Sequence, residues 1–196
     1  NAFTSSDWTA YPFARQTPKD FENLLRIYLA AGFFSNLDPL DFAQEGHRLE
    51  LSDNDDLTSP LVYKGVVFNE MKGAMSSVNS LLWQALSAAL FDNTYHYNSG
   101  GDPEAITELS YAELKRFYQK HYHPSNAIFM TFGDMPAAQH QERFESLALS
   151  DFERSDAHIE VDLATPINEP FRLKQAYSLD DSDDLSAKTH LVMGWK

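Results

Sequence analysis

Hydrophobic side chains recur at helical spacing after residue 17 and predict the first long helix. Thr17 suits an N-cap, Pro18 suits the first helical position, and Gly32 marks the expected end. The same signals predict a short helix from Asp38-Pro39 to Gly46. The apolar face of the long helix comprises Phe21, Leu24, Leu25, Tyr28 and Leu29.

A second apolar stripe predicts a long helical region from about Val66 to Leu90. Gly73 and the pair Ser76-Ser77 weaken its middle, so we expect a kink there. Further helices are predicted after the loop 99–103, after the capping box formed by Ser110 and Glu113, and near residues 136–148.

Short strands are predicted where apolar residues run together or alternate with polar ones. The run from Asn126 to Phe132 is nearly all apolar, so we expect a strand that is buried on both faces. Helices and strands alternate without a strict βαβ rhythm, which favours an α+β fold with helices packed on a mostly antiparallel sheet. The other predicted strands are 1–4, 9–14, 47–51, 171–178 and 188–195.

Composition narrows the classes of function. The chain has 196 residues, a hydrophobic fraction of 43% and a net charge of -14. Cysteine is absent, which excludes a disulfide scaffold, a thiolate metal site and a cysteine nucleophile. We expect no membrane partner, because no apolar run reaches membrane-spanning length, and no nucleic-acid partner, because the charge repels a polyanion.

Most of the negative charge lies in two stretches. Residues 38–56 carry a net charge of -6, residues 151–184 carry -7, and all other residues together carry -1. Solvated loops or a linker explain such runs, and steering of basic ligands toward a nearby cleft is the alternative. We assign residues 1–150 to a first domain, 151–170 to an acidic linker and 171–196 to the first strands of a second domain.

The chain starts at Asn1 rather than at a methionine, and it ends at Lys196 directly after an apolar run. A domain rarely stops inside a strand, because the sheet edge is then left unfinished. We therefore expect a fragment of a longer protein, truncated at both ends. Core surface left exposed in such a fragment favours self-association.

Few catalytic motifs are present, since no GxSxG, GxGxxG, P-loop, HExxH or HxxEH pattern occurs. His121 and His123 form a close pair, which either shares one face of an extended segment and chelates a metal, or ends a helix before Pro124. Glu70 lies beside the apolar stripe of the second helical region. A carboxylate there is either a surface residue or a group that needs a partner or a metal.

Four segments, in this order, are similar to one family. They are Asn1-Ala2-Phe3-Thr4, Lys64–Ala74 (KGVVFNEMKGA), Ser99–Pro103 (SGGDP) and His121–Ala127 (HYHPSNA). Together they resemble the presequence-protease branch of the pitrilysin/insulinase zinc metallopeptidases, the inverzincins. The likeness runs from Asn1 to about Gly133 and continues more loosely beyond it. It implies a two-layer insulinase-type domain.

The resemblance also implies a site. In that family an HxxEH helix supplies two histidine ligands and a glutamate base for one zinc ion, and a later glutamate is the third ligand. By this resemblance Glu70 is that third ligand. Asn1, Ala2, Phe3 and Thr4 then form an edge strand near the zinc, where an extended peptide adds as a further strand. The implied activity is endoproteolysis of unstructured peptides inside a closed chamber.

The sequence departs from the family because it has no HxxEH helix and lacks the second half of the family's chain. Tyr63 stands where the sister insulinase branch has a second glutamate. We therefore expect the base upstream of Asn1, and we expect the chain alone to be inactive and to hold no zinc. The implied partners are unstructured peptides and the remainder of the same polypeptide.

Two alternatives stay open. The chain could belong to a non-catalytic insulinase-fold subunit that acts as a binding or structural partner. It could also be an independent domain that holds a metal through His121 and His123. The resemblance implies a cytoplasmic location in a bacterium and an organelle matrix in a eukaryote.

Overall fold

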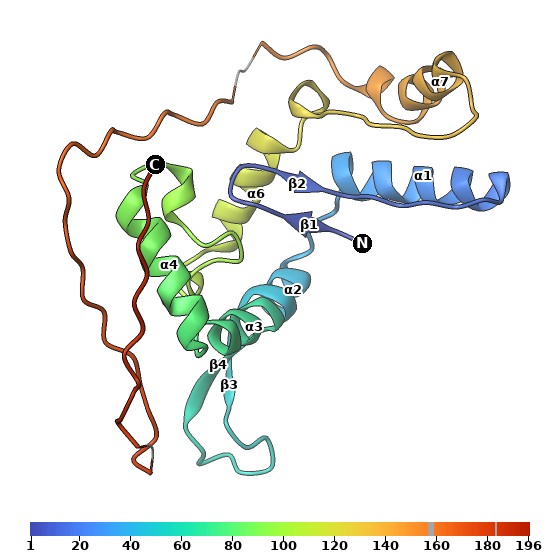
Figure 1. Ribbon diagram of the computed structural model, residues 1–196. Helices are drawn as coiled ribbons and strands as arrows, with labels where there is room; N and C mark the ends of the chain where they lie inside the picture. Colours follow the sequence, from blue (N-terminus) through green and yellow to red (C-terminus); the bar gives the residue numbers. More distant parts are fainter. Residues whose placement is uncertain (157–158, 183) are drawn as a thin grey trace. The chain divides into compact units, whose positions relative to one another are not determined.

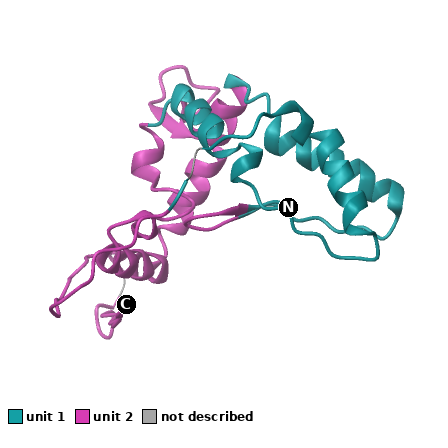
Figure 2. Ribbon diagram, turned by 90° about the horizontal axis from the view of Figure 1, so that it is seen from above, with its two compact units in different colours: residues 1–3, 10–39, 109–160 teal, residues 4–9, 40–108, 161–196 magenta. Residues whose placement is uncertain are grey.

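A computed structural model of the protein describes residues 1–156, 159–182 and 184–196. The predicted linker 151–170 and the predicted second-domain segment 171–196 therefore each include positions outside the described residues, namely 157, 158 and 183. The described chain divides into two compact units (Figure 2). Unit 1 comprises Asn1–Phe3, Ala10–Pro39 and Leu109–Glu160, and unit 2 comprises Thr4–Thr9, Leu40–Glu108 and Val161–Lys196.

Unit 1 is organised around the pairing of α1 (Pro18–Phe33) with α7 (Ala137–Leu147), which lie side by side in Figure 1. An ion pair joins the two helices, with 3.0 Å between Arg143 Nε and Glu22 Oε2. The buried centre of this unit consists of Leu25, Leu29 and Ala148, with Phe13, Phe21, Phe33, Phe129, Phe144 and Leu147 packed around it. Burial of these side chains is the main stabilising term that the unit has.

A half-buried tyrosine hydroxyl links helix α6 (Tyr111–His121) to the end of α1. The hydroxyl of Tyr118 donates to the carbonyl of Gly32 at 3.0 Å and accepts from the amide of Ser35 at 3.0 Å. The predicted capping box starts this helix, because Ser110 and Glu113 each bond the other's backbone amide. Short 3₁₀ turns follow at Pro124–Asn126 (η3) and Leu149–Asp151 (η4).

Unit 2 is built from a β-hairpin that runs directly into two consecutive helices. Strand β3 (Arg48–Leu51) pairs antiparallel with β4 (Leu61–Lys64), with Arg48 opposite Lys64. Figure 1 shows β4 leading straight into α3. The helical elements that fall in or reach unit 2 are α2 (Pro39–Asp41), the π-helix η1 (Phe42–Gly46), α3 (Val66–Ala74), α4 (Val78–Leu90), η2 (Thr94–His96) and α5 (Pro103–Ile106).

The helix predictions are confirmed closely. The long helical region breaks into α3 and α4 at residues 75–77, where glycine and serine were expected to weaken it. Thr17 occupies the N-cap position of α1, although its side chain makes no capping hydrogen bond, and α1 ends one residue after Gly32. The α+β class is also confirmed, with sheets of two strands each among the described residues: β1–β2 (Phe3–Thr4 and Thr9–Ala10) and β3–β4.

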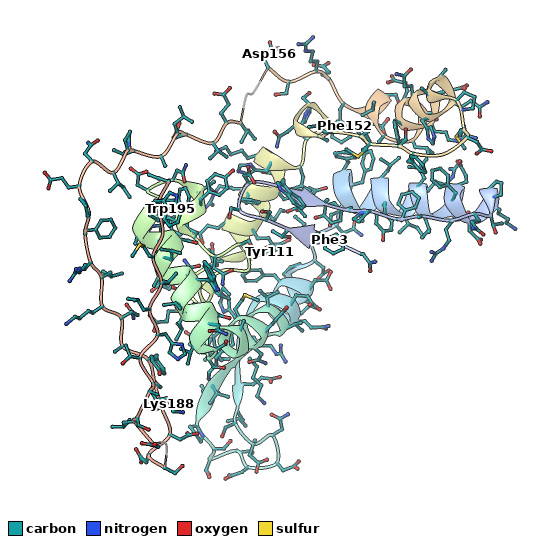
Figure 3. The ribbon with its side chains drawn as sticks, viewed as in Figure 1. Phe3, Tyr111, Phe152, Asp156, Lys188 and Trp195 are labelled. Carbon is teal, nitrogen blue, oxygen red and sulfur yellow. The ribbon has the colours of Figure 1, made fainter. Side chains whose placement is uncertain are left out.

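The predictions of strands at 126–132, 171–178 and 188–195 are wrong for this structure. None of these segments is a strand, and 11–14 does not extend β2. A strand needs a neighbour for its backbone hydrogen bonds, and the described residues supply none here. Figure 3 shows the extended run through Lys188 to Trp195. The large side chains left exposed are Ile128, Met130, Phe132, Leu191, Met193 and Trp195.

No helix in the described part of the chain is both long enough and apolar enough to cross a membrane.

Candidate functional site

Glu70 lies on α3, and its side chain is exposed. The helix buries its other face through Phe68, which is only 8% exposed. Among the described residues, no hydrogen bond or ion pair occupies the Glu70 carboxylate. The carboxylate is therefore free to accept a ligand on a helix whose opposite face is fixed.

The fit of this site to a metal is partial. Glu70 offers one carboxylate, a good ligand type for zinc, whose protein sites usually have three or four ligands. Within the described residues, no group of three or more histidine, aspartate or glutamate side chains is placed to hold a metal ion. The described residues can therefore supply one ligand to a zinc site, and they do not form a complete metal site by themselves.

The predicted substrate strand is β1, within the segment Asn1–Thr4. All four of its side chains are exposed, and Phe3 projects from β1 in Figure 3. Strand β1 pairs with β2 in a two-stranded sheet, so one of its edges has no strand partner among the residues described. The turn between the strands is closed by a hydrogen bond of 2.8 Å from the amide of Ser5 to the carbonyl of Trp8. A free edge of this kind can accept an extended peptide.

The turn of this hairpin is anchored within unit 2. Thr94 Oγ1 donates to the carbonyl of Ser6 at 3.0 Å, and the hydroxyl of Tyr95 donates to Asp7 Oδ2 at 2.7 Å. The hydrogen bond to Asp7 raises the pKa of the Tyr95 phenol. Strand β1 itself straddles the boundary of the two units, whereas Glu70 lies in unit 2.

His121 and His123 do not share a metal-binding geometry. The ring of His121, the last residue of α6, stacks on Phe117 with 4.3 Å between the ring centroids. Burial, and then the charge of Lys120, lower the pKa of His121. The ring of His123 instead meets Phe152 edge-on, and its Nδ1 accepts from the amide of Ser125 at 3.1 Å. These contacts agree with the interpretation of a helix end.

An open cleft of about 410 Å³ adjoins the helix that carries Glu70, and sequence reasoning did not identify it. Its lining combines apolar and sulfur-containing side chains with side chains that carry hydroxyl and amide groups. The signal in the sequence was faint, because the cleft forms only when the turn at 98–100 folds against two helices. Its lining comprises Met71, Ala74, Met75, Ser80, Trp83, Gln84, Ser87, Asn98, Ser99 and Gly100.

Comparison with known proteins gives one consistent family. Residues 108–196 match the family model described as "Peptidase M16 inactive domain". The mitochondrial presequence protease of Danio rerio is 53% identical over 171 residues, which cover 87% of this chain and 17% of that protein. Those of Xenopus tropicalis and Gibberella zeae are 46% and 38% identical, over 94% and 100% of this chain and 18% and 19% of theirs.

The likeness and the α+β architecture define the class of protein: the chain belongs to the M16 family of peptidases. Within that family it belongs to the presequence-protease branch, as its relatives at 38–53% identity indicate. The chain spans less than a fifth of the length of these curated relatives.

Proposed function

We propose that this chain is part of a zinc metalloendopeptidase that degrades unstructured peptides, and that it carries one zinc ligand and the substrate edge strand. The observation that carries this proposal is the similarity to presequence proteases across most of the chain, Glu70 and β1 included. Because the chain covers only a small share of those proteins, the activity is a property of the complete polypeptide that contains these residues.

The proposed role of Glu70 is that of a metal ligand. Its support is an unengaged carboxylate on the exposed side of a helix that is fixed on its other side by Phe68. When bound with an open coordination position, zinc polarises a peptide carbonyl and activates water. The remaining ligands and the general base belong to other parts of the polypeptide in this proposal.

The proposed role of β1 is to bind substrate through its backbone. An extended peptide that adds to the free edge forms main-chain hydrogen bonds, which depend little on the peptide's side chains. Such binding selects for unstructured peptides, because a folded protein cannot present an extended segment. It also explains a loose sequence preference.

The cleft beside α3 suits the apolar side chains of such peptides. Met71 and Met75 are flexible and polarizable, so they adapt to side chains of different shape. Trp83 adds a flat aromatic wall and is 61% exposed. None of the described residues that line the cleft is charged, which favours apolar contacts within it.

A second candidate function is that of a non-catalytic subunit of the same fold. The description "Peptidase M16 inactive domain" for residues 108–196 favours it. That match begins after α3, however, so it does not include Glu70 or β1. A subunit without catalysis has no requirement for an unengaged glutamate at this position, and we therefore prefer the peptidase.

The relatives are named as mitochondrial presequence proteases. They support an organellar location for this protein if its source is a eukaryote. The proposed partners are unstructured peptides and the rest of the same polypeptide, which would complete a closed chamber around the substrate.

The test is peptide hydrolysis by the complete polypeptide. We expect cleavage of an unstructured peptide that is lost with a metal chelator and lost in the Glu70→Gln variant. Glu104→Gln is the matched control, because Glu104 is also exposed, lies in unit 2 and undergoes the same change of charge. Cleavage by Glu70→Gln at the wild-type rate would contradict the proposal.

A further inference from the structure

The start of α3 is held by a close crossing of two backbones. Gly65 is the N-cap residue of α3 and is buried. A Cβ atom placed on Gly65 would lie 2.0 Å from the carbonyl oxygen of Gly46, 2.7 Å from its carbonyl carbon and 3.0 Å from Cα of His47. All three are backbone atoms, which cannot swing aside as a side chain can. The φ angle of Gly65 is 170°, so glycine is needed here for space rather than for its dihedral freedom.

Ring contacts surround this crossing. His47 meets Phe42 edge-on at 5.4 Å between ring centroids and Tyr63 at 6.0 Å. Tyr63 in turn contacts Phe68, in the first turns of α3, at 6.1 Å. Phe68 is nearly buried. The rings therefore link η1, the β3–β4 hairpin and α3 at one point.

The crossing is connected to Glu70 by a short and rigid path. Strand β4 ends at Lys64 and α3 begins at Val66, so Gly65 alone joins them. The carbonyl of Gly65 accepts from the amide of Asn69 at 3.0 Å, and Glu70 is the next residue. The position of Gly65 thus sets the axis and the rotation of the helix that presents the Glu70 carboxylate.

We propose that Gly65 is a positioning residue for Glu70, acting through its crossing with Gly46. This inference rests on the proposed role of Glu70 as a zinc ligand. A metal ligand must be held to within about 0.5 Å of its working position. Glu70 has no hydrogen-bonded partner in the described chain to orient it, so its direction depends on how firmly α3 is placed.

The test compares three glycine-to-alanine variants of the complete polypeptide, with zinc affinity measured by competition with a chelator. Gly65→Ala should weaken zinc binding about tenfold or more, as loss of a supporting residue does in metal sites. Gly73→Ala should leave it unchanged, because nothing lies within 4 Å of a Cβ there. Gly100→Ala should change it by less than about twofold, since the atoms nearest to its new Cβ belong to the flexible Met71 side chain, which can turn into the adjacent cleft.

A control and a substitute variant separate positioning from general stability. Leu29→Ala lowers the stability of unit 1, which does not contain α3, so its zinc affinity should equal that of the wild type. If Gly65→Ala does not fold, Phe68→Leu replaces it, because it loosens the same part of α3 without a backbone clash. The proposal would be overturned if Gly65→Ala, or Phe68→Leu used in its place, bound zinc as tightly as the wild type. It would also be overturned if Leu29→Ala weakened zinc binding as much as Gly65→Ala does.

Zinc binding by the Glu70→Gln variant distinguishes failure of this inference from failure of the proposed function. If Glu70→Gln binds zinc like the wild type, Glu70 is not a ligand and the proposed function fails. If Glu70→Gln loses zinc while the positioning variants keep it, the positioning proposal alone fails. Hydrogen exchange of the amides of residues 69–74 in zinc-free protein is the second readout. It should be faster in Gly65→Ala and no faster than wild type in Gly73→Ala, where alanine favours the helix. Equal rates in wild type and Gly65→Ala would contradict the positioning role.

Discussion

At the scale of single residues, the proposed zinc chemistry depends on Glu70, whose surroundings do not differ from those of a surface glutamate. Glu70 is exposed on a helix, which is also what a solvated surface glutamate would show. Periodicity alone left this choice open, because hydrophobic patterning records burial and says nothing of a ligand supplied from elsewhere in a polypeptide. The resemblance of the surrounding segment, Lys64–Ala74, to a metallopeptidase motif is what singles this residue out.

A second glutamate gives a prediction on pH. Hydrogen bonds from the hydroxyl and then the amide of Ser110 lower the pKa of Glu113 at the start of α6. A carboxyl whose pKa is lower in the folded state stabilises it above the unfolded pKa of about 4.3. That stabilisation is lost as the pH falls through the lowered folded pKa.

The measurement is the thermal midpoint of the chain against pH for wild type and Glu113→Gln. The wild type should be more stable at pH 7, and the difference should vanish once the pH is well below the lowered pKa of Glu113. Ser110→Ala removes the hydrogen bond from the hydroxyl, so the effect of Glu113→Gln at pH 7 should be smaller in that background without being abolished. A difference that persists unchanged in acid would contradict this account of the capping box.

At the scale of elements, helices were predictable and several strands were not. The signals for α1, α4 and α6 are local: N-cap positions, a proline at the first helical position, a capping box and apolar periodicity. Strand pairing is non-local, because each strand needs a second strand from elsewhere in the chain for its backbone hydrogen bonds. An apolar run such as 126–132 indicates a segment that can form a strand, but it does not show which segment pairs with it. Strand β4 was missed because it has only four residues, LVYK, which do not alternate between apolar and polar, and because its pairing with β3 crosses a loop of nine residues, 52–60.

The packing of α1 on its neighbours gives the element-scale prediction. Leu29 is 6% exposed at the centre of unit 1, so Leu29→Ala leaves a cavity and should lower the free energy of unfolding by about 2–5 kcal/mol. Leu40→Ala makes the same chemical change at a side chain that is 78% exposed and should cost less than about 0.5 kcal/mol. Urea denaturation measures both, and equal losses would show that unit 1 does not have the core described.

At the scale of the whole molecule, the exposed apolar side chains are the dominant feature. Ile128, Met130 and Phe132 are 93%, 92% and 103% exposed and alternate along an extended segment, while Phe129 between them packs in the core. Exposed apolar surface of this extent marks a place where protein surface is normally covered. In a chain that spans under a fifth of its relatives, the rest of the polypeptide is the natural source of that cover.

The chain of 196 residues, prepared alone, should therefore self-associate and should not cleave peptides. We expect its sedimentation coefficient to rise with protein concentration. A variant with threonine at positions 128, 130 and 132 should associate less, because threonine suits an extended segment and reduces the apolar area. A concentration-independent monomer, or chelator-sensitive peptide cleavage by this chain alone, would contradict this prediction.

The most direct test of the central claim is the zinc content of the complete polypeptide that contains this chain, compared with its Glu70→Gln variant. Glu104→Gln and His121→Ala are the controls, the latter because it removes the only alternative metal ligand pair that the sequence suggested. We predict about one zinc per polypeptide in the wild type and both controls, and a sharp fall in Glu70→Gln. A wild type without zinc, or a Glu70→Gln variant that holds as much as the wild type, would contradict the assignment of Glu70 and favour the non-catalytic subunit.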